Sequence, residues 1–256
     1  MVLMHRLLKK AAFYNKVPTF YLQHASVVEE FPKLDFDLSL LEGMDALSKY
    51  NKKGIDNNVE LIGMPKFDRY YNCINSNLVI NNIGICTNIL ESEETLSSFI
   101  KELRENFKSM PIFLRPHPAD KRLEFYKKLS RQFNLFLSNS QNENSFDFLR
   151  KVDLNISGGS SVHLEAVLMN VYPIHYKFNK ERYDDYGYLK NGLLLHSFDK
   201  VKDVVSHINS IKYNKPNIRN RAKYYVESVN TPYDGKSTEK AIQLIKEHVE
   251  SYNVNQ

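Results

Sequence analysis

The sequence predicts an α/β protein in which parallel strands alternate with helices, with one complete C-terminal domain preceded by a short or truncated N-terminal lobe. Short β-branched and aromatic runs alternate with amphipathic stretches along most of the chain, which is the rhythm of a parallel sheet. Two polar loops, at residues 115–118 and 157–161, each follow an apolar run. The 256 residues, 42% of them hydrophobic, are enough for one large core or two modest ones.

The N-terminal part of the chain holds only about three strands. Strands are expected over residues 17–24, 36–41 and 59–62, and a helix over residues 44–52. Residues 69–82 are polar, Asn-rich and weakly periodic, which is typical of a linker. The sequence therefore predicts a partial α/β lobe over residues 1–68, followed by a linker over residues 69–82.

From residue 83 onward the alternation is complete enough for a whole domain. Strands are expected over residues 83–89, 111–114, 134–137, 152–156, 171–176 and 193–196. Helices are expected over residues 92–107, 121–133, 145–150 and 161–169, and from about residues 198, 217 and 237. This pattern predicts a doubly wound, Rossmann-like domain over residues 83–235 with ligands at the carboxyl ends of its strands. Residues 236–256 form a further helix, with packing back on the N-terminal lobe as one option.

Composition excludes several classes of function. The net charge of +5 is mild and no basic run is interleaved with aromatics, so the sequence does not predict nucleic-acid binding. Cys73 and Cys86 have no metal or redox spacing, which favours reduced thiols in a cytoplasmic protein. No stretch approaches the length of a membrane span.

The first twelve residues mix basic residues, among them Lys9 and Lys10, with leucines. They are too charged for the core of a signal peptide. Two interpretations stay open: a surface helix lying on a sheet, or a basic amphipathic helix that holds the protein at the inner face of the membrane.

The loop at residues 157–161 has features of an anion site. Its two glycines let the backbone turn tightly after the strand, and Ser160 or Ser161 is placed to cap the following helix. A helix N-terminus offers free N–H groups to a phosphate, and Glu165, one turn after Ser161, could reach ribose hydroxyls. The alternative is that the serines only cap a helix whose apolar residues face the core.

The loop at residues 115–118, Arg-Pro-His-Pro, strengthens the anion-binding interpretation. The two prolines fix the backbone, so the side chains of Arg115 and His117 are held in defined directions. Arginine binds phosphate oxygens in a fork, and histidine can donate to a phosphate or a leaving group. In the alternative, the prolines only end a strand.

Other candidates are weaker. His24 follows the first strand and is either a general base near a cleft or a hydrogen-bonded structural histidine. His163 begins a run like that of zinc deaminases, but the Pro-Cys-x-x-Cys partner is absent. Tyr183, Tyr186 and Tyr188 fit a sugar pocket or a surface turn equally well. Neither a Walker A pattern nor Gly-x-Gly-x-x-Gly occurs.

Five motifs in order resemble those of bacterial surface-polysaccharide transferases with a GT-B fold. They are YLQH at 21–24, GMPKFD at 63–68, RPHP at 115–118, Ser160-Ser161 with LEA at 164–166, and DGKS at 234–237. The group includes CDP-glycerol glycerophosphotransferases of teichoic acid synthesis, capsule Kdo transferases and sialyltransferases with a His-Pro motif. The resemblance covers residues 17–245 and implies two facing lobes, the C-terminal one holding the nucleotide.

The resemblance also implies roles for individual residues. Arg115, Ser160 and Ser161 would bind the donor phosphate, Glu165 would lie near the ribose, and His117 and His24 would be catalytic. It further implies a CMP- or CDP-linked nucleotide-sugar donor, a glycan or lipid-linked acceptor, and neither a metal ion nor a separate cofactor.

The chain departs from the group's pattern in places. Ala25 stands where glycine usually follows Gln-His, and Gly63-Met64-Pro65 stands where Gly-Asn-Pro is expected. The N-terminal lobe is expected to lack its first strands. Two other functions therefore stay open. One is a UDP-sugar 2-epimerase-like enzyme, which shares the two-lobe architecture and a similar helix start; the other is a non-catalytic nucleotide-binding lobe that needs a partner chain.

Overall fold

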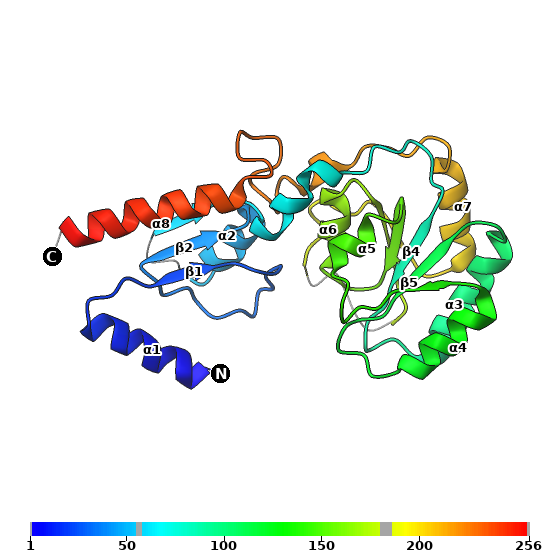
Figure 1. Cartoon of the computed structure of the whole chain (residues 1–256), viewed down its shortest axis with the longest axis horizontal. Helices are drawn as coiled ribbons and strands as arrows, with labels where there is room; N and C mark the ends of the chain where they lie inside the picture. The colour runs from blue at the N-terminus through cyan, green and yellow to red at the C-terminus, as the bar shows by residue number, and fades with distance from the viewer. Residues whose placement is uncertain (1, 55–57, 180–185, 255–256) are drawn as a thin grey trace. The chain divides into compact units, whose positions relative to one another are not determined.

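The computed structural model describes residues 2–54, 58–179 and 186–254, and the chain divides into two compact units (Figure 1). Unit 1 contains the residues up to Arg69 and those from Lys223 onward, and unit 2 contains Tyr70–Ala222. The sequence placed a linker at residues 69–82 and the end of the second domain at residue 235. In the structure the chain first passes from unit 1 to unit 2 between Arg69 and Tyr70, within a 3-10 helix, η1 (Pro65–Cys73).

Unit 1 is built on a three-stranded parallel sheet of order β1-β2-β3. Its elements are α1 (Val2–Tyr14), β1 (Phe20–Leu22), β2 (Leu38–Leu41), α2 (Met44–Asn51), β3 (Asn58–Leu61) and α8 (Ser237–Val254). Leu38 and Leu40 of the central strand pack with Ala241 of α8, whereas Leu41 packs with Ala46 of α2. Because side chains alternate across a strand, the two helices cover opposite faces of this sheet.

Two of the sequence motifs meet within unit 1. Gly63 has φ +85°, and a Cβ atom there would lie 2.1 Å from the Ser228 hydroxyl oxygen, so the position requires glycine. Ser237, the first residue of α8, donates its hydroxyl proton to Ser228 Oγ (3.0 Å). The carboxylate of Asp68 accepts from the backbone N–H groups of Ser237 (2.9 Å) and Thr238 (2.7 Å). The residues 63–68 thus fix the start of α8.

Unit 2 holds a six-stranded parallel sheet of order β6-β5-β4-β7-β8-β9. The strands are β4 (Ile83–Cys86), β5 (Ile112–Arg115), β6 (Phe136–Leu137), β7 (Leu154–Ser157), β8 (Tyr172–Tyr176) and β9 (Ser197–Phe198). The helices are α3 (Glu93–Asn106), α4 (Leu123–Phe133), α5 (Ser145–Leu149), α6 (Val162–Leu168), α7 (Val201–Ile211) and the short η2 (Arg219–Ala222). The helices α3, α4 and α7 lie together on one face of the sheet, and α5 and α6 lie together on the other (Figure 1).

This topology confirms the predicted α/β class with a Rossmann-like sheet. The strands progress outward in both directions from the neighbours β4 and β7, so the carboxyl ends of these two strands flank the topological switch point, where open α/β sheets bind their ligands.

Two local predictions were wrong. The strand expected at 193–196 is irregular backbone that follows a turn, with Leu194 N–H donating to the Tyr188 carbonyl, and β9 comes just after it. Leu193 and Leu194 are buried, so the apolar run reflects burial in the core and not sheet pairing. The helix expected from residue 217 is only the 3-10 turn η2. Among the described residues, no helix is long and apolar enough to cross a membrane.

Candidate functional site

The two loops predicted from the sequence begin at the same edge of the sheet of unit 2, on either side of β4. Arg115 ends β5 and Ser157 ends β7, and both pair in register with Cys86, the last residue of β4. Ser157 donates its hydroxyl proton to the Cys86 carbonyl (2.9 Å), and Thr87 N–H donates to the Arg115 carbonyl (3.0 Å). The two loops are therefore separated by a single strand at the switch point.

Arg115 is a buried cation at this edge. It is 7% exposed, and its guanidinium lies over the Phe148 ring, 5.9 Å from the centroid. One N–H, from Nη1, donates to Ser138 Oγ at 3.3 Å, and Ser138 in turn donates to Glu143, which pairs with Lys151. Within the described residues Arg115 makes no other hydrogen bond, so most of its donors are available to a ligand.

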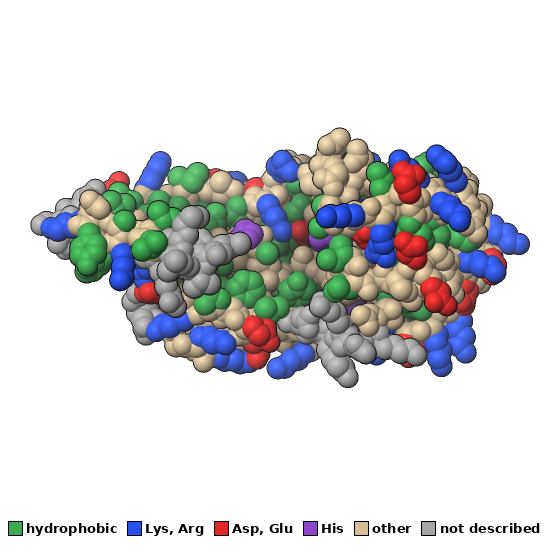
Figure 2. All heavy atoms as spheres, turned by 90° about the horizontal axis from the view of Figure 1, so that it is seen from below, with side chains coloured by type: hydrophobic (Ala, Val, Ile, Leu, Met, Phe, Trp, Pro, Cys, Tyr) green, Lys and Arg blue, Asp and Glu red, His purple; other side chains and the backbone are tan. Residues whose placement is uncertain are grey.

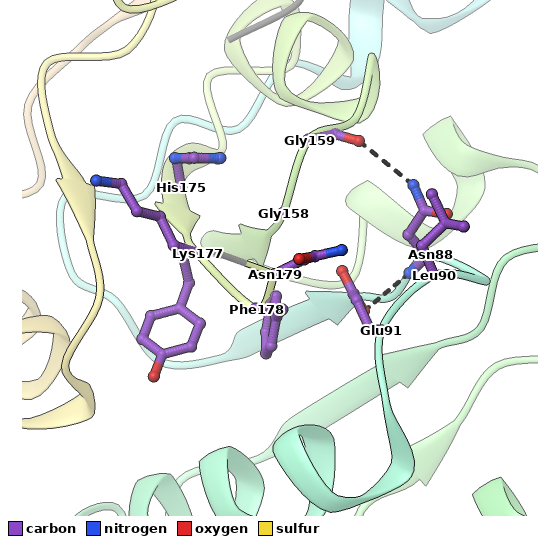
Figure 3. Close-up of a pocket in the computed structure, with 10 residues that line it drawn as sticks. Asn88, Leu90, Glu91, Gly158, Gly159, His175, Lys177, Phe178 and Asn179 are labelled. Carbon is purple, nitrogen blue, oxygen red and sulfur yellow. Dashed lines mark hydrogen bonds between the residues drawn. The ribbon is translucent and has the colours of Figure 1, made fainter. Parts of the chain in front are cut away.

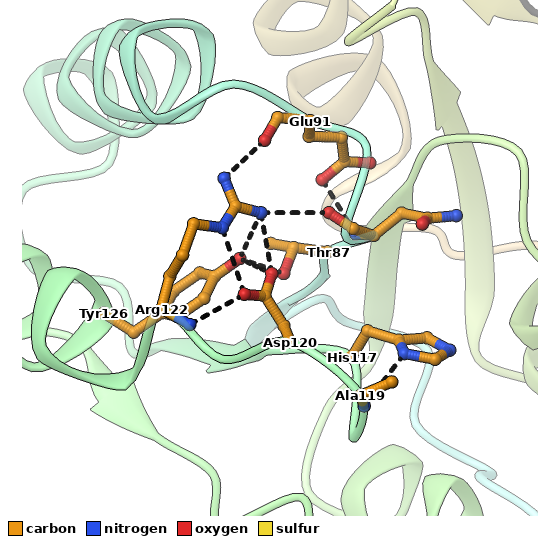
Figure 4. A network of polar contacts seen from close by, with 8 residues as sticks. Thr87, Glu91, His117, Ala119, Asp120, Arg122 and Tyr126 are labelled. Atoms are coloured by element: carbon orange, nitrogen blue, oxygen red, sulfur yellow. Dashed lines mark hydrogen bonds and ion pairs between the residues drawn. The ribbon is translucent and has the colours of Figure 1, made fainter.

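His117 lies on the exposed loop after β5. Its Nδ1 accepts a hydrogen bond from the backbone N–H of Ala119 (3.1 Å; Figure 4). An accepting Nδ1 carries no proton, so the geometry favours the neutral ring with its proton on Nε2. His117 can therefore offer an Nε2–H donor to a ligand without being charged.

A polar network that the sequence analysis missed ties this loop to the next one (Figure 4). Asp120 accepts from Arg122 Nε (3.0 Å) and Nη2 (2.7 Å) and from the Tyr126 hydroxyl (2.8 Å). Arg122 Nη1 also donates to the Glu91 carbonyl in the β4–α3 loop (2.6 Å). Burial opposes ionisation of Asp120, but the hydrogen bonds from Arg122 and Tyr126 outweigh it and lower the pKa to about 2. The ionised pair therefore fixes both loops relative to each other.

Of the two glycines after β7, only Gly158 is needed for space, and neither is needed for an unusual backbone conformation. Neither Gly158 nor Gly159 has positive φ. A Cβ atom on Gly158 would lie 2.9 Å from Glu91 Oε1, whereas one on Gly159 would meet nothing within 4 Å. Ser161 is the N-cap residue of the seven-residue α6, but its side chain makes no capping hydrogen bond. Ser160 Oγ accepts from the N–H of Val162 (3.3 Å).

His163, on α6, orients the glycine loop through a hydrogen bond. It is 1% exposed, and burial lowers its pKa to about 3, so the ring is neutral. Its Nε2 lies 2.9 Å from the Gly158 carbonyl oxygen and must carry the proton to donate there. A trans peptide points its C=O and N–H in opposite directions, so this bond turns the Gly159 N–H away from the core.

Glu91 is the second feature that sequence reasoning missed. It is 4% exposed, and its Oε2 accepts from the backbone N–H of Asn88 (2.9 Å). Burial raises the pKa of this carboxyl to about 8, although the bond from Asn88 opposes the shift. With Glu91, a pocket of about 30 Å³ is lined by Asn88, Leu90, Gly158, Gly159, His175, Tyr176, Lys177, Phe178 and Asn179 (Figure 3). An acidic residue a few positions after the first strand of a Rossmann-like domain was the available signal.

The remaining sequence candidates are placed as follows. Glu165 is buried in α6. His24 is exposed after β1 in unit 1, next to Gln23, whose Oε1 accepts from the N–H of Glu42 (2.8 Å). Tyr188 belongs to the core and Tyr186 is half-buried; Tyr183 lies outside the described residues. Among those residues, no three His, Cys, Asp or Glu side chains gather closely enough to hold a metal ion.

The fold, not the sequence, relates this chain to known proteins. No family model and no curated protein matches it. A putative UDP-N-acetylglucosamine 2-epimerase from Listeria monocytogenes is 15% identical with a TM-score of 0.65, over 94% of this chain and 70% of that one. The S. aureus MnaA structure with UDP is 14% identical with a TM-score of 0.63, over 94% and 72%. A variant of the wall teichoic acid polymerase TagF soaked with CDPG is 14% identical with a TM-score of 0.55, over 84% and 58%.

These likenesses agree with the two sheets described above. The chain has a GT-B-like fold. It spans 58% of the TagF chain. At these identities the likeness concerns the fold.

Proposed function

We propose that the protein is a GT-B-type transferase of bacterial surface-polysaccharide synthesis. It would move a glycosyl or glycerophosphoryl group from a CMP- or CDP-linked donor to a glycan or lipid-linked acceptor, working in the cytoplasm or at the inner face of the membrane. The observation that carries the proposal is Arg115, a buried guanidinium one strand from the switch point that makes a single hydrogen bond within the described part of the chain. A buried cation with free donors is suited to the oxygens of a phosphate.

The proposed reaction gives each residue a task. Arg115, with Ser160 and Ser161, holds the donor phosphate and offsets the negative charge that the leaving nucleotide gains. His117 donates from Nε2 to a phosphate oxygen, which fits the tautomer fixed by Ala119.

The acceptor hydroxyl forms its new bond to the transferred carbon or phosphorus as the bond to the leaving phosphate oxygen breaks. His24 takes the acceptor proton, and Glu165 binds the ribose. The donor is a substrate, and the proposal includes no metal ion and no separate cofactor. The choice of a cytidine nucleotide is supported by the TagF structure soaked with CDPG.

Calorimetric titration with CMP, CDP, UDP and ADP tests the proposal. We expect binding of CMP or CDP in the micromolar to millimolar range, and about 10- to 100-fold weaker binding for Arg115→Ala because charge-assisted hydrogen bonds are lost. His117→Ala and Ser161→Ala should weaken it less. Arg131→Ala, an exposed arginine on α4, is the matched control and should bind as the wild type does. Failure of every nucleotide to bind would refute the proposal.

A second candidate is a UDP-sugar 2-epimerase-like enzyme. It is supported by the TM-scores of 0.63 and 0.65 with the MnaA structure and the Listeria protein. It predicts a preference for UDP and turnover of UDP-N-acetylglucosamine without any acceptor.

The third hypothesis, a nucleotide-binding lobe that requires a partner chain, is supported by the three-stranded sheet of unit 1. Light scattering and pull-down from the native host test it, and an active monomer would count against it.

A further inference from the structure

The carboxyl group of Glu91 has one unused oxygen at the pocket of unit 2. The residue is 4% exposed, and its Oε2 is occupied by the Asn88 N–H. Its Oε1 lies over Gly158 and makes no hydrogen bond within the described residues. Figure 3 shows the carboxyl group directed into the space that the lining residues enclose. This oxygen borders the pocket, where a ligand group can take the place of water as its hydrogen-bond partner.

The neighbouring groups define the kind of ligand that fits. The side-chain amide of Asn88, whose Nδ2 donates to the Gly159 carbonyl (3.4 Å), borders the same space, and Lys177 adds a cation at its rim. Burial holds the carboxyl largely protonated at neutral pH, so its Oε1 can both donate and accept. Groups that can both donate and accept hydrogen bonds match a hydroxyl, which does the same. A phosphate fits less well, because its negative charge would be repelled whenever the Glu91 carboxyl ionised.

The size of the pocket limits which part of a ligand can enter it. Its volume of about 30 Å³ is roughly twice what one water molecule needs, so it holds a single hydroxyl-bearing arm and not a whole ring. The pocket lies over β7 and β8, whereas Arg115 ends β5, two strands from β7 in the sheet order. At about 4.8 Å per strand this is on the order of 10 Å, the span between a nucleotide's phosphates and the group they carry.

We propose that Glu91 determines specificity by hydrogen-bonding, through Oε1, a terminal hydroxyl of the polyol or sugar that the nucleotide carries. This inference rests on the proposed function, because it takes the nucleotide's phosphate to lie at Arg115. Neither Arg115 nor the serines of the loop would make this contact. Glu91 would therefore act on the carried group and not on the nucleotide.

Calorimetry with pairs of ligands separates these contributions. The probes are CDP and CDP-glycerol, with UDP and UDP-N-acetylglucosamine as a second pair. The measured quantity is the ratio of the two dissociation constants within the pair that the wild type binds. Glu91→Leu should reduce the preference for the carrying ligand about 5- to 10-fold, the worth of one hydrogen bond, and leave the bare nucleotide unchanged. Glu91→Gln, which keeps a donor and an acceptor, should stay within about 2-fold of the wild type.

A second measurement needs no variant. The wild-type chain is titrated with CDP-glycerol and with the analogue that lacks the terminal hydroxyl, and we expect the analogue to bind about 5- to 10-fold more weakly. Equal affinities here, or an unchanged ratio in Glu91→Leu, would overturn the inference and leave the nucleotide site standing. If the wild type binds no nucleotide of either pair, the proposed function fails and this inference fails with it.

Discussion

Replacing Glu91 by glutamine should remove a pH dependence from the stability of unit 2. Burial raises the native-state pKa of this carboxyl from 4.5 to about 8. Between these two values the folded protein keeps a proton that the unfolded chain has released. Folding therefore becomes less favourable as the pH rises through this window, and the loss is complete only above the folded pKa.

The size of the effect follows from the two pKa values. Because proton binding and folding are linked, the free energy of unfolding should fall by about 2 to 3 kcal/mol between pH 5 and pH 7. Glu91→Gln does not titrate, so its stability relative to the wild type should rise by the same amount across that range. For a domain of this size the shift corresponds to roughly 5–10 °C in Tm.

Urea denaturation followed by circular dichroism at pH 5, 6, 7 and 8 measures this difference. Unit 1 is the same in both proteins, so the difference between the two curves reports on unit 2. Glu105→Gln, which changes an exposed carboxyl on the helix that follows Glu91, α3, is the control and should run parallel to the wild type. Parallel curves for the wild type and Glu91→Gln would show that the carboxyl ionises normally, and the argument from burial would be refuted.

Three further predictions test other contacts. Gly158→Ala should destabilise the protein by about 1–2 kcal/mol because its Cβ would meet a carboxyl oxygen at 2.9 Å, whereas Gly159→Ala should be neutral; thermal melts of the two compare them directly. Asp120→Asn should cost about 2–3 kcal/mol in urea denaturation at pH 7, since it breaks the pair with Arg122; a variant as stable as the wild type at this pH would contradict the assigned pair. Gly63→Ala should cost more than about 3 kcal/mol, because positive φ and the approach of a serine hydroxyl both exclude a side chain; a soluble variant with unchanged melting would disprove this.

Periodicity predicted most of the fold because the strands are short, apolar and separated by helices. The strands of the two sheets follow this pattern, except that β9 lies just after the apolar run assigned to it. Leu193 and Leu194 misled the prediction because a buried turn and a buried strand have the same composition. The return of the chain to unit 1 at Lys223 has no composition signal of its own, since it depends on contacts with residues far back in the sequence.

The candidate site was only partly readable for the same reason. The sequence pointed to the residues of the Arg-Pro-His-Pro loop. It did not predict that Arg115 is buried while His117 is exposed. Glu91 was missed because its environment comes from another strand's loop, at Gly158. The partners of Asp120 are near in sequence, but only the fold brings one of them, Tyr126, against Thr87 after β4. The roles assigned to His24, His117, Ser160, Ser161 and Glu165 stay predictions until ligands are tested.

The division of the chain has a consequence for its synthesis. Unit 2 is one continuous segment, whereas unit 1 needs α8 to cover the sheet face made by Leu38 and Leu40. Domains fold as units while the chain is still being made, usually the first one first. Here the order is reversed. Unit 2 is fully synthesised before α8, the helix that covers one face of the sheet of unit 1. The early strands must therefore be kept from pairing wrongly until about residue 254 has emerged.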